Sequence, residues 1–135
     1  MIALTRVLFY IYVAALLGVG ASGVFIAEWE LTQLFGVPLY QMELTSQATL
    51  LSQYRFLKSA ELAFGIFVWF SRHEILAGGA SKRIFLIGIF AGVFARLFAV
   101  AVDGMPHWSI LLFAAEELAA GLCVLIYARQ RPVLA

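Results

Sequence analysis

The sequence predicts an all-α membrane protein, a bundle of four transmembrane helices forming one domain over residues 1–135. Hydrophobic residues make up 64% of the chain and charged residues only 13%, whereas ordinary soluble domains carry about 25% charged residues. The mean hydropathy is +0.97, and a small soluble domain has too little interior to bury so many apolar side chains. The apolar residues also form continuous runs, which excludes the alternating pattern of a membrane β-barrel.

Four segments contain the run of about 20 mostly apolar residues that a helix needs to cross a bilayer. The first is longer than the apolar core of a signal peptide, about 7–15 residues, so we expect it to be retained as a helix. Gly36 and Pro38 interrupt the chain after this first segment, which predicts an interfacial segment between helices 1 and 2. The four predicted spans are Leu4–Ala27, Ala48–Phe70, Ile84–Asp103 and Ser109–Tyr127.

The basic residues outside these spans predict the orientation in the membrane. Lys and Arg occur before the first span, between the second and third spans, and after the fourth span. The two other loops contain no Lys or Arg and instead carry the carboxylates Glu28, Glu30, Glu43 and Asp103. Because cytoplasmic loops of membrane proteins are enriched in Lys and Arg, both termini are predicted to lie in the cytoplasm.

The second span contains three charges in the stretch YRFLKSAELAFGIFVWF, namely Arg55, Lys58 and Glu61. The apolar part that follows them, Leu62–Phe70, covers less than half of the bilayer core at about 1.5 Å per residue. The transmembrane helix must therefore include Lys58 and Glu61, and in our interpretation also Arg55.

The third and fourth spans also carry charges, at Arg96 and at Glu116 and Glu117. The six charged residues of the three spans lie at similar depths in the outer-to-middle part of the bilayer, because residues advance by about 1.5 Å each. Inserting a charge at the middle of a membrane helix costs about 2.5–3.5 kcal/mol. The charges of three cations that face three carboxylates could cancel. We expect Arg96 to pair with Glu116 or Glu117, and Lys58 or Arg55 to pair with another carboxylate.

The helical period suggests which faces meet inside the bundle. Tyr54, Lys58, Glu61 and Gly65 share one face of the second span, at about 100° per residue. In the fourth span Glu116 shares a face with other core positions, and Glu117 is turned partly aside. A stripe of small residues is expected to let the first span approach a neighbour closely: Ala14, Gly18 and Ser22.

Other polar residues give weaker signals. Asp103 and His107 form a polar pair of side chains in the outer loop, but a metal site needs three or four ligands, so no metal is predicted. No catalytic constellation is recognisable, the catalytic residues stay unknown, and no cofactor is expected. The net charge of +1 gives no reason to expect nucleic acid as a partner.

Three local patterns resemble an uncharacterised family of small bacterial four-helix membrane proteins, known only as a domain of unknown function and similar in outline to DoxX-like proteins. They are YRF at residues 54–56, ARLFAVAVDGMP, and a glutamate within the last span. The resemblance implies a bacterial inner membrane and no particular activity. Lys58 and Glu61 depart from the family pattern, whose matching positions here are Arg55, Arg96, Gly104, Pro106 and Glu116 or Glu117.

Three functions are compatible with these residues. The first is a non-catalytic accessory or binding component of a membrane assembly, with the lipid bilayer and a membrane protein or a second copy as partners. The second is binding or transport of a small anionic or lipophilic molecule, such as a lipid or a quinone-like ring, through the charged cluster. The third is a small membrane enzyme that uses Glu116 or Glu117 as acid or base on a lipid.

Overall fold

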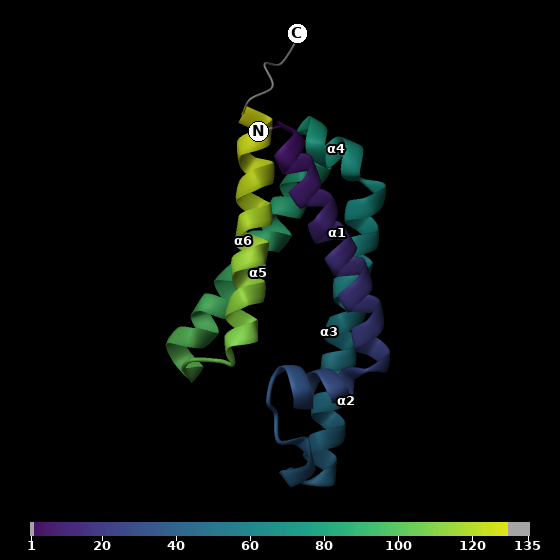
Figure 1. Cartoon of the computed structure of the whole chain (residues 1–135), viewed down its shortest axis with the longest axis vertical. Helices are drawn as coiled ribbons and strands as arrows, with labels where there is room; N and C mark the ends of the chain where they lie inside the picture. Colours follow the sequence, from purple (N-terminus) through teal and green to yellow (C-terminus); the bar gives the residue numbers. More distant parts are fainter. Residues whose placement is uncertain (1, 130–135) are drawn as a thin grey trace. The chain divides into compact units, whose positions relative to one another are not determined.

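The computed structural model describes the backbone of residues 2–129 and the side chains of residues 4–126. Every regular element in this described part is helical, so the predicted all-α class is confirmed (Figure 1). The elements in chain order are α1 (Ile2–Phe25), α2 (Ala27–Trp29), the π-helix η1 (Glu30–Leu34), the 3-10 helix η2 (Leu39–Gln41), α3 (Leu44–Phe70), α4 (Arg72–Ala77), α5 (Ala80–Asp103) and α6 (Trp108–Arg129).

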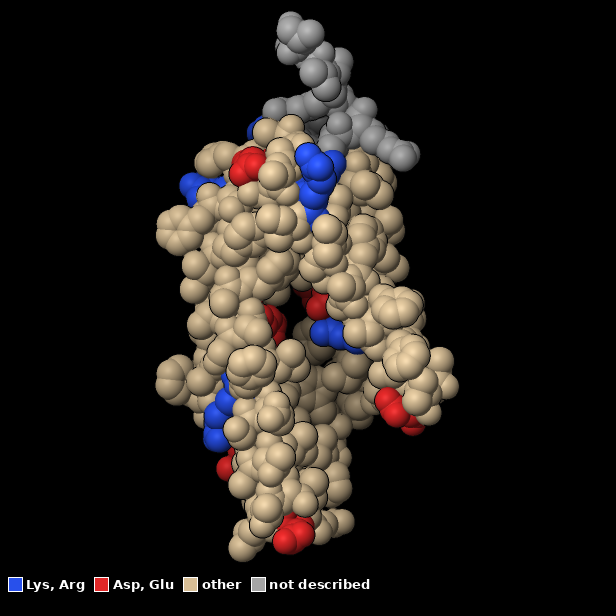
Figure 2. Space-filling view, turned by 180° about the vertical axis from the view of Figure 1, so that it is seen from behind, with Lys and Arg blue, Asp and Glu red and all other residues tan. Residues whose placement is uncertain are grey.

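Three of the described helices are long and apolar enough to cross a membrane, over Leu4–Phe25, Ala80–Asp103 and Trp108–Ile126. On the face drawn in Figure 2, charged side chains are few and other residues form most of the surface. Apolar side chains exposed over whole helices need an apolar surrounding. These three helices therefore indicate an integral membrane protein.

Helix α3 is not among these three, because Arg55, Lys58 and Glu61 interrupt its apolar sequence. It nevertheless runs without a break from Leu44 to Phe70. It begins four residues before the predicted span at Ala48, and the three charges lie inside one continuous helix. The backbone therefore does not start a new element after Glu61.

The chain divides into two compact units, one formed by Met1–Val13 with Val68–Ala135 and the other by Ala14–Phe67. In the unit Ala14–Phe67, the second half of α1 packs closely against α3. A Cβ atom on Gly20 would lie 2.7 Å from the backbone nitrogen of Leu62, and one on Gly65 would lie 3.0 Å from Leu16 Cβ. Small residues thus bring the two backbones together, as is common between membrane helices.

The small-residue stripe that the sequence suggested for the first span was the wrong one. Ala14, Gly18 and Ser22 are exposed, and a Cβ atom on Gly18 would meet no atom within 4 Å. From Leu16 onward, the buried positions of α1, α2 and the first residue of η1 instead recur at alternating steps of four and three residues. They are Leu16, Gly20, Gly23, Ala27 and Glu30.

The segment after α1 is a tight helical turn and not an open loop. The backbone breaks at Ile26, and η1 then closes with a hydrogen bond from the Phe35 N–H to the Glu30 carbonyl oxygen at 3.1 Å. This five-residue step is the hydrogen bond of a π-helix, a form that often occurs at functional sites. Leu31 and Leu39 are buried beneath the segment, so Glu30 is held firmly at the start of η1.

In the other unit, α5 and α6 lie side by side (Figure 1). Phe85, Ile89 and Val93 of α5 are buried, and Ile89 fills the space beside Gly121 of α6. Helix α5 ends at Gly104, whose φ of 94° is one that side chains other than glycine rarely adopt.

Helix α4 precedes α5, and its Glu74 side chain caps the first turn of that helix. The Ser81 hydroxyl and the Ser81 N–H donate to the two Glu74 carboxylate oxygens at 2.6 and 3.1 Å. These hydrogen bonds, the one from the hydroxyl first, hold the pKa of the Glu74 carboxyl below its ordinary value of 4.5. A carboxylate at the start of a helix is also favoured by the helix dipole.

Candidate functional site

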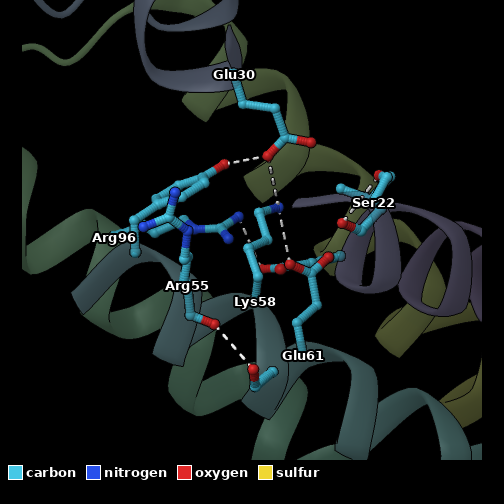
Figure 3. A network of polar contacts seen from close by, with 10 residues as sticks. Ser22, Glu30, Arg55, Lys58, Glu61 and Arg96 are labelled. Atoms are coloured by element: carbon cyan, nitrogen blue, oxygen red, sulfur yellow. Dashed lines mark hydrogen bonds and ion pairs between the residues drawn. The ribbon is translucent and has the colours of Figure 1, made fainter. Parts of the chain in front are cut away.

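Lys58 is the centre of a polar network in the unit Ala14–Phe67 (Figure 3). It lies in the middle of α3, and only 6% of its surface is exposed. Its Nζ atom lies 3.0 Å from Glu61 Oε2, one turn further along the same helix, and 3.8 Å from Glu30 Oε2. One ammonium group is therefore shared between two carboxylates.

Glu30 comes from η1 and is 5% exposed. Besides the Lys58 ammonium, its Oε2 atom accepts a hydrogen bond from the Tyr54 hydroxyl. The Tyr54 ring in turn lies 5.5 Å from Lys58 Nζ, centroid to atom, and packs edge-on against Phe35. Buried charges are tolerated when they are paired and hydrogen-bonded, and both conditions hold for this carboxylate.

Gly23 of α1 provides the room for this network. A Cβ atom at Gly23 would lie 2.5 Å from Lys58 Cδ and 2.9 Å from Glu30 Oε2. Real Cβ atoms do not approach other atoms so closely. The Lys58 side chain therefore extends across a position of α1 that only glycine leaves free.

Arg55 lies one turn before Lys58 but stays outside this network. It is exposed, and its Nε atom donates to the Val24 carbonyl oxygen of α1 at 3.2 Å. No carboxylate within ion-pair distance of Arg55 is found among the described side chains. The expectation that Lys58 or Arg55 pairs with a carboxylate is met by Lys58.

The other unit contains a second ion pair. The Nη1 atom of Arg96 on α5 lies 3.1 Å from Oε2 of Glu117 on α6. The two groups form an ion pair without the geometry of a hydrogen bond. Gly92, one turn before Arg96, leaves space beside the same carboxylate, since a Cβ atom there would lie 3.6 Å from Glu117 Oε2. The sequence left open which of two glutamates pairs with Arg96, and the structure selects Glu117.

Glu116 has the opposite surroundings. The sequence placed it on the core face of the last span, but its side chain is exposed on α6. Consecutive helical residues point about 100° apart, so Glu116 cannot share the environment of Glu117. Further along α6, Ala120 and Val124 lie in the core and are 5% and 1% exposed.

Sequence reasoning missed Glu30, which it assigned to an outer loop together with Glu28. The regular spacing of Leu16, Gly20, Gly23 and Ala27 does not by itself predict this contact, because the backbone breaks at Ile26 and the turn of η1 then directs Glu30 toward Lys58. Within the unit Ala14–Phe67, Glu30 is thus the second carboxylate that faces the Lys58 ammonium group, beside Glu61.

Asp103 and His107, the polar pair predicted for the outer loop, have different surroundings. Asp103 is the exposed last residue of α5, whereas His107 Nδ1 lies 2.8 Å from the Ser109 hydroxyl. Groups of three or more His, Cys, Asp or Glu residues able to hold a metal ion are not found in the described part of the chain.

Comparisons with known proteins give one result that bears on identity. No curated protein and no solved structure matches the chain. One family model matches residues 4–128, from the start of α1 to the end of α6, which confirms the uncharacterised family that the local patterns suggested. The chain therefore belongs to the family described as domain of unknown function DUF4345.

Proposed function

We propose that this chain is an integral protein of the bacterial inner membrane, crosses it four times, and serves as a non-catalytic accessory or binding component of a membrane assembly. In this proposal α3 is the fourth span and both termini lie in the cytoplasm. The observation that carries the proposal is that Lys58 and Glu61, the two most central charges of α3, lie 3.0 Å apart within the helix itself.

The cost of inserting α3 supports this reading. Three unpaired charges would cost on the order of 8–10 kcal/mol at about 2.5–3.5 kcal/mol each. The intrahelical pair of Lys58 with Glu61 cancels two of these charges, and Glu30 adds a second carboxylate from η1. The remaining charge, Arg55, lies nearer the outer end of the helix.

A non-catalytic role agrees with how the polar groups are used. Lys58, Glu30 and Tyr54 bind one another, and Arg96 binds Glu117, so these side chains serve to hold helices together. Large apolar side chains meanwhile remain exposed along the helices, among them Phe56, Ile87, Phe94 and Val102, each more than 60% exposed. Such surfaces contact lipid or the helices of a partner protein.

The topology is testable by labelling single cysteines. In a Cys123→Ser background, a cysteine at Ser46 should react with an impermeant maleimide added outside intact cells, because this residue lies near the outer end of α3. A cysteine at His73, in α4, should react only after the membrane is permeabilised. Reaction of both positions from the same side would show that α3 does not cross the membrane.

The role in an assembly is tested by extracting the protein from native membranes with a mild detergent. A component of an assembly should migrate at a size well above that of the 14.9 kDa chain with its detergent. Migration as a monomer at every concentration would contradict the proposed role while leaving the topology untouched.

A second candidate function, binding of a small anionic or lipophilic molecule, is favoured by one observation. A shallow, open depression of about 600 Å³ lies at the outer end of α3, and Arg55 follows in the next turn. The hydroxyl and amide groups that line this depression suit a polar headgroup. Loss of a co-purifying lipid in Arg55→Gln, measured by native mass spectrometry, would favour it. The residues that line the depression are Leu44, Thr45, Ala48, Thr49, Ser52 and Gln53.

A further inference from the structure

The segment that joins α3 to α5 carries an excess of positive charge. Its Lys and Arg residues are Arg72, Lys82 and Arg83, and its single carboxylate is Glu74. Both oxygens of that carboxylate accept hydrogen bonds from Ser81, so Glu74 caps α5 and forms no ion pair with these cations. Among the described residues, the guanidinium groups of Arg72 and Arg83 thus have no carboxylate partner, and all these residues belong to one unit of the chain.

Arg72 is held in place at the end of α3. Its guanidinium carbon lies 4.6 Å from the centroid of the Trp69 ring, and its Nη1 atom donates to the Trp69 carbonyl oxygen at 2.7 Å. Tyr10 of α1 packs edge-on against the same ring, with 6.4 Å between the centroids. The Nε and Nη2 atoms of Arg72 donate to no atom of the described residues. This edge of a guanidinium group can bind a phosphate through two parallel hydrogen bonds.

The backbone of Arg83 lies near that of Arg72, because a tight turn joins α4 to α5. Ser81, two residues before Arg83, contacts Glu74, two residues after Arg72. A Cβ atom on Gly79 in this turn would lie 2.5 Å from Glu74 Cγ, so the turn is closely packed. The Arg83 side chain is exposed. Two cations therefore flank one polar contact at the same end of these helices.

We infer that Arg72 and Arg83 form a basic patch that binds the headgroup of an anionic phospholipid in the cytoplasmic leaflet. This inference rests on the proposed function, because it requires the topology in which α4 lies at the cytoplasmic surface. The lipid phosphate accepts hydrogen bonds from Arg72, and Arg83 adds a second positive charge. Trp69 is consistent with this level, since tryptophan side chains gather where lipid headgroups meet hydrocarbon.

The surroundings of the basic patch suit a lipid, which has an anionic headgroup and apolar chains. Phe70 and Ile84, next to the patch in the sequence, are 77% and 55% exposed. Acyl chains therefore find apolar side chains directly beside the cations that bind the headgroup. Anionic lipids of the cytoplasmic leaflet also attract basic side chains near the membrane surface.

The fluorescence of Trp69 tests the inference at the patch itself. In a chain with Trp29→Phe and Trp108→Phe, which change two exposed side chains, Trp69 is the only remaining tryptophan. Dioleoyl phosphatidylglycerol, titrated into the protein in a neutral detergent, should change its emission, because the headgroup binds the guanidinium that covers the ring. Phosphatidylcholine should change it much less, since its headgroup carries no net charge.

Arg83→Gln in the same background should weaken phosphatidylglycerol binding about fivefold, which corresponds to about 1 kcal/mol for one cation at an anionic surface. Arg72→Gln should lower the number of phosphatidylglycerol molecules retained in native mass spectrometry. If Arg72→Gln does not accumulate, Arg83→Gln carries the test alone, because its side chain is exposed. His73→Gln is the matched control, since it changes an exposed side chain of α4 and leaves both guanidinium groups in place.

Equal responses to the two lipids, or an Arg83→Gln variant that binds phosphatidylglycerol as tightly as the original chain, would overturn the inference. Failure of the proposed topology gives a different result. Reaction of a cysteine at His73 with the impermeant maleimide from outside would refute that topology and the lipid site together. Reaction only after permeabilisation, without a preference for phosphatidylglycerol, would refute the lipid site and leave the proposed function standing.

Discussion

The side chain of Lys58 crosses the helix α1 at Gly23, in a space that any other residue would fill. A Cβ atom on Gly23 would lie 2.5 Å from Lys58 Cδ. Lys58 reaches the Glu30 carboxylate only along this path, so a glycine in one helix and a lysine in another together determine where a buried ion pair forms.

Replacing Gly23 with alanine should therefore destabilise the protein. The added methyl group would displace the Lys58 side chain and the Glu30 carboxylate, and overpacking of this kind costs about 1–3 kcal/mol. The free energy of unfolding in detergent, followed by circular dichroism in a denaturant titration, measures the effect. Gly18→Ala is the matched control, because a Cβ atom there meets nothing within 4 Å, and it should leave stability unchanged or raise it by up to about 1 kcal/mol, since alanine is the better helix former.

Lys58→Met should be more damaging than the change at Gly23. It leaves Glu30 buried at 5% exposure without the ammonium group, and removal of one partner from a buried pair costs about 3–5 kcal/mol. Adding Glu30→Gln should recover part of this loss, because the neutral amide still accepts the hydrogen bond from Tyr54. A double variant whose loss equals the sum of the two single losses would show that Lys58 and Glu30 do not interact.

The pair of Arg96 and Glu117 predicts a difference between two neighbouring glutamates. Thermal unfolding of Arg96→Met, Glu117→Gln and the double variant should give an interaction free energy of about 0.5–3 kcal/mol, because the two side chains lie 3.1 Å apart. The same double-mutant comparison with Glu116→Gln in place of Glu117→Gln, measured on dilute monomeric protein, should give almost no interaction free energy. Equal interaction free energies for Glu116 and Glu117 would contradict the observed pairing.

The Glu74 cap predicts a pH dependence at the junction of α4 and α5. Hydrogen bonds from Ser81 lower the folded-state pKa of Glu74 below 4.5, so the folded state binds fewer protons in this range than the unfolded state. The stabilisation is complete above pH 4.5 and is lost as the pH falls through the lowered pKa. A Ser81→Ala variant should raise the pKa of Glu74, which nuclear magnetic resonance of the side-chain carboxyl carbon measures directly. An unchanged pKa would show that the Ser81 hydroxyl does not stabilise the carboxylate.

The sequence predicted those features of the structure that depend only on the helical period and on the length of the apolar runs. The all-α class follows from long apolar runs, and the common face of Tyr54, Lys58 and Glu61 follows from 100° per residue. Arg96 was expected to meet one of two adjacent carboxylates, and the helical period placed Glu116 on the core face, whereas Glu117 forms the pair. That choice depends on the rotation of α6, which places Ala120 and Val124 in the core.

The remaining part of the site depends on backbone details that residue patterns do not reveal. The break at Ile26 and the π-helical turn that starts at Glu30 redirect the chain after α1. An acidic residue beside Trp29 is typical of an exposed interfacial loop, and this segment read alone favours that assignment. Only the turn, closed by Phe35 and by buried Leu31 and Leu39, directs Glu30 toward Lys58.

The pairing of Lys58 with Glu61 inside α3 bears on how the chain is made. In the proposed four-span topology, a nascent α3 that carries its own counter-ion can leave the insertion machinery and enter lipid before later helices have been synthesised. Arg96 and Glu117 must instead wait until α6 follows α5 out of the ribosome. The proposed topology therefore gives biogenesis an order, in which α1 and α3, with the salt bridge inside α3, can settle while the second half of the protein is still being translated.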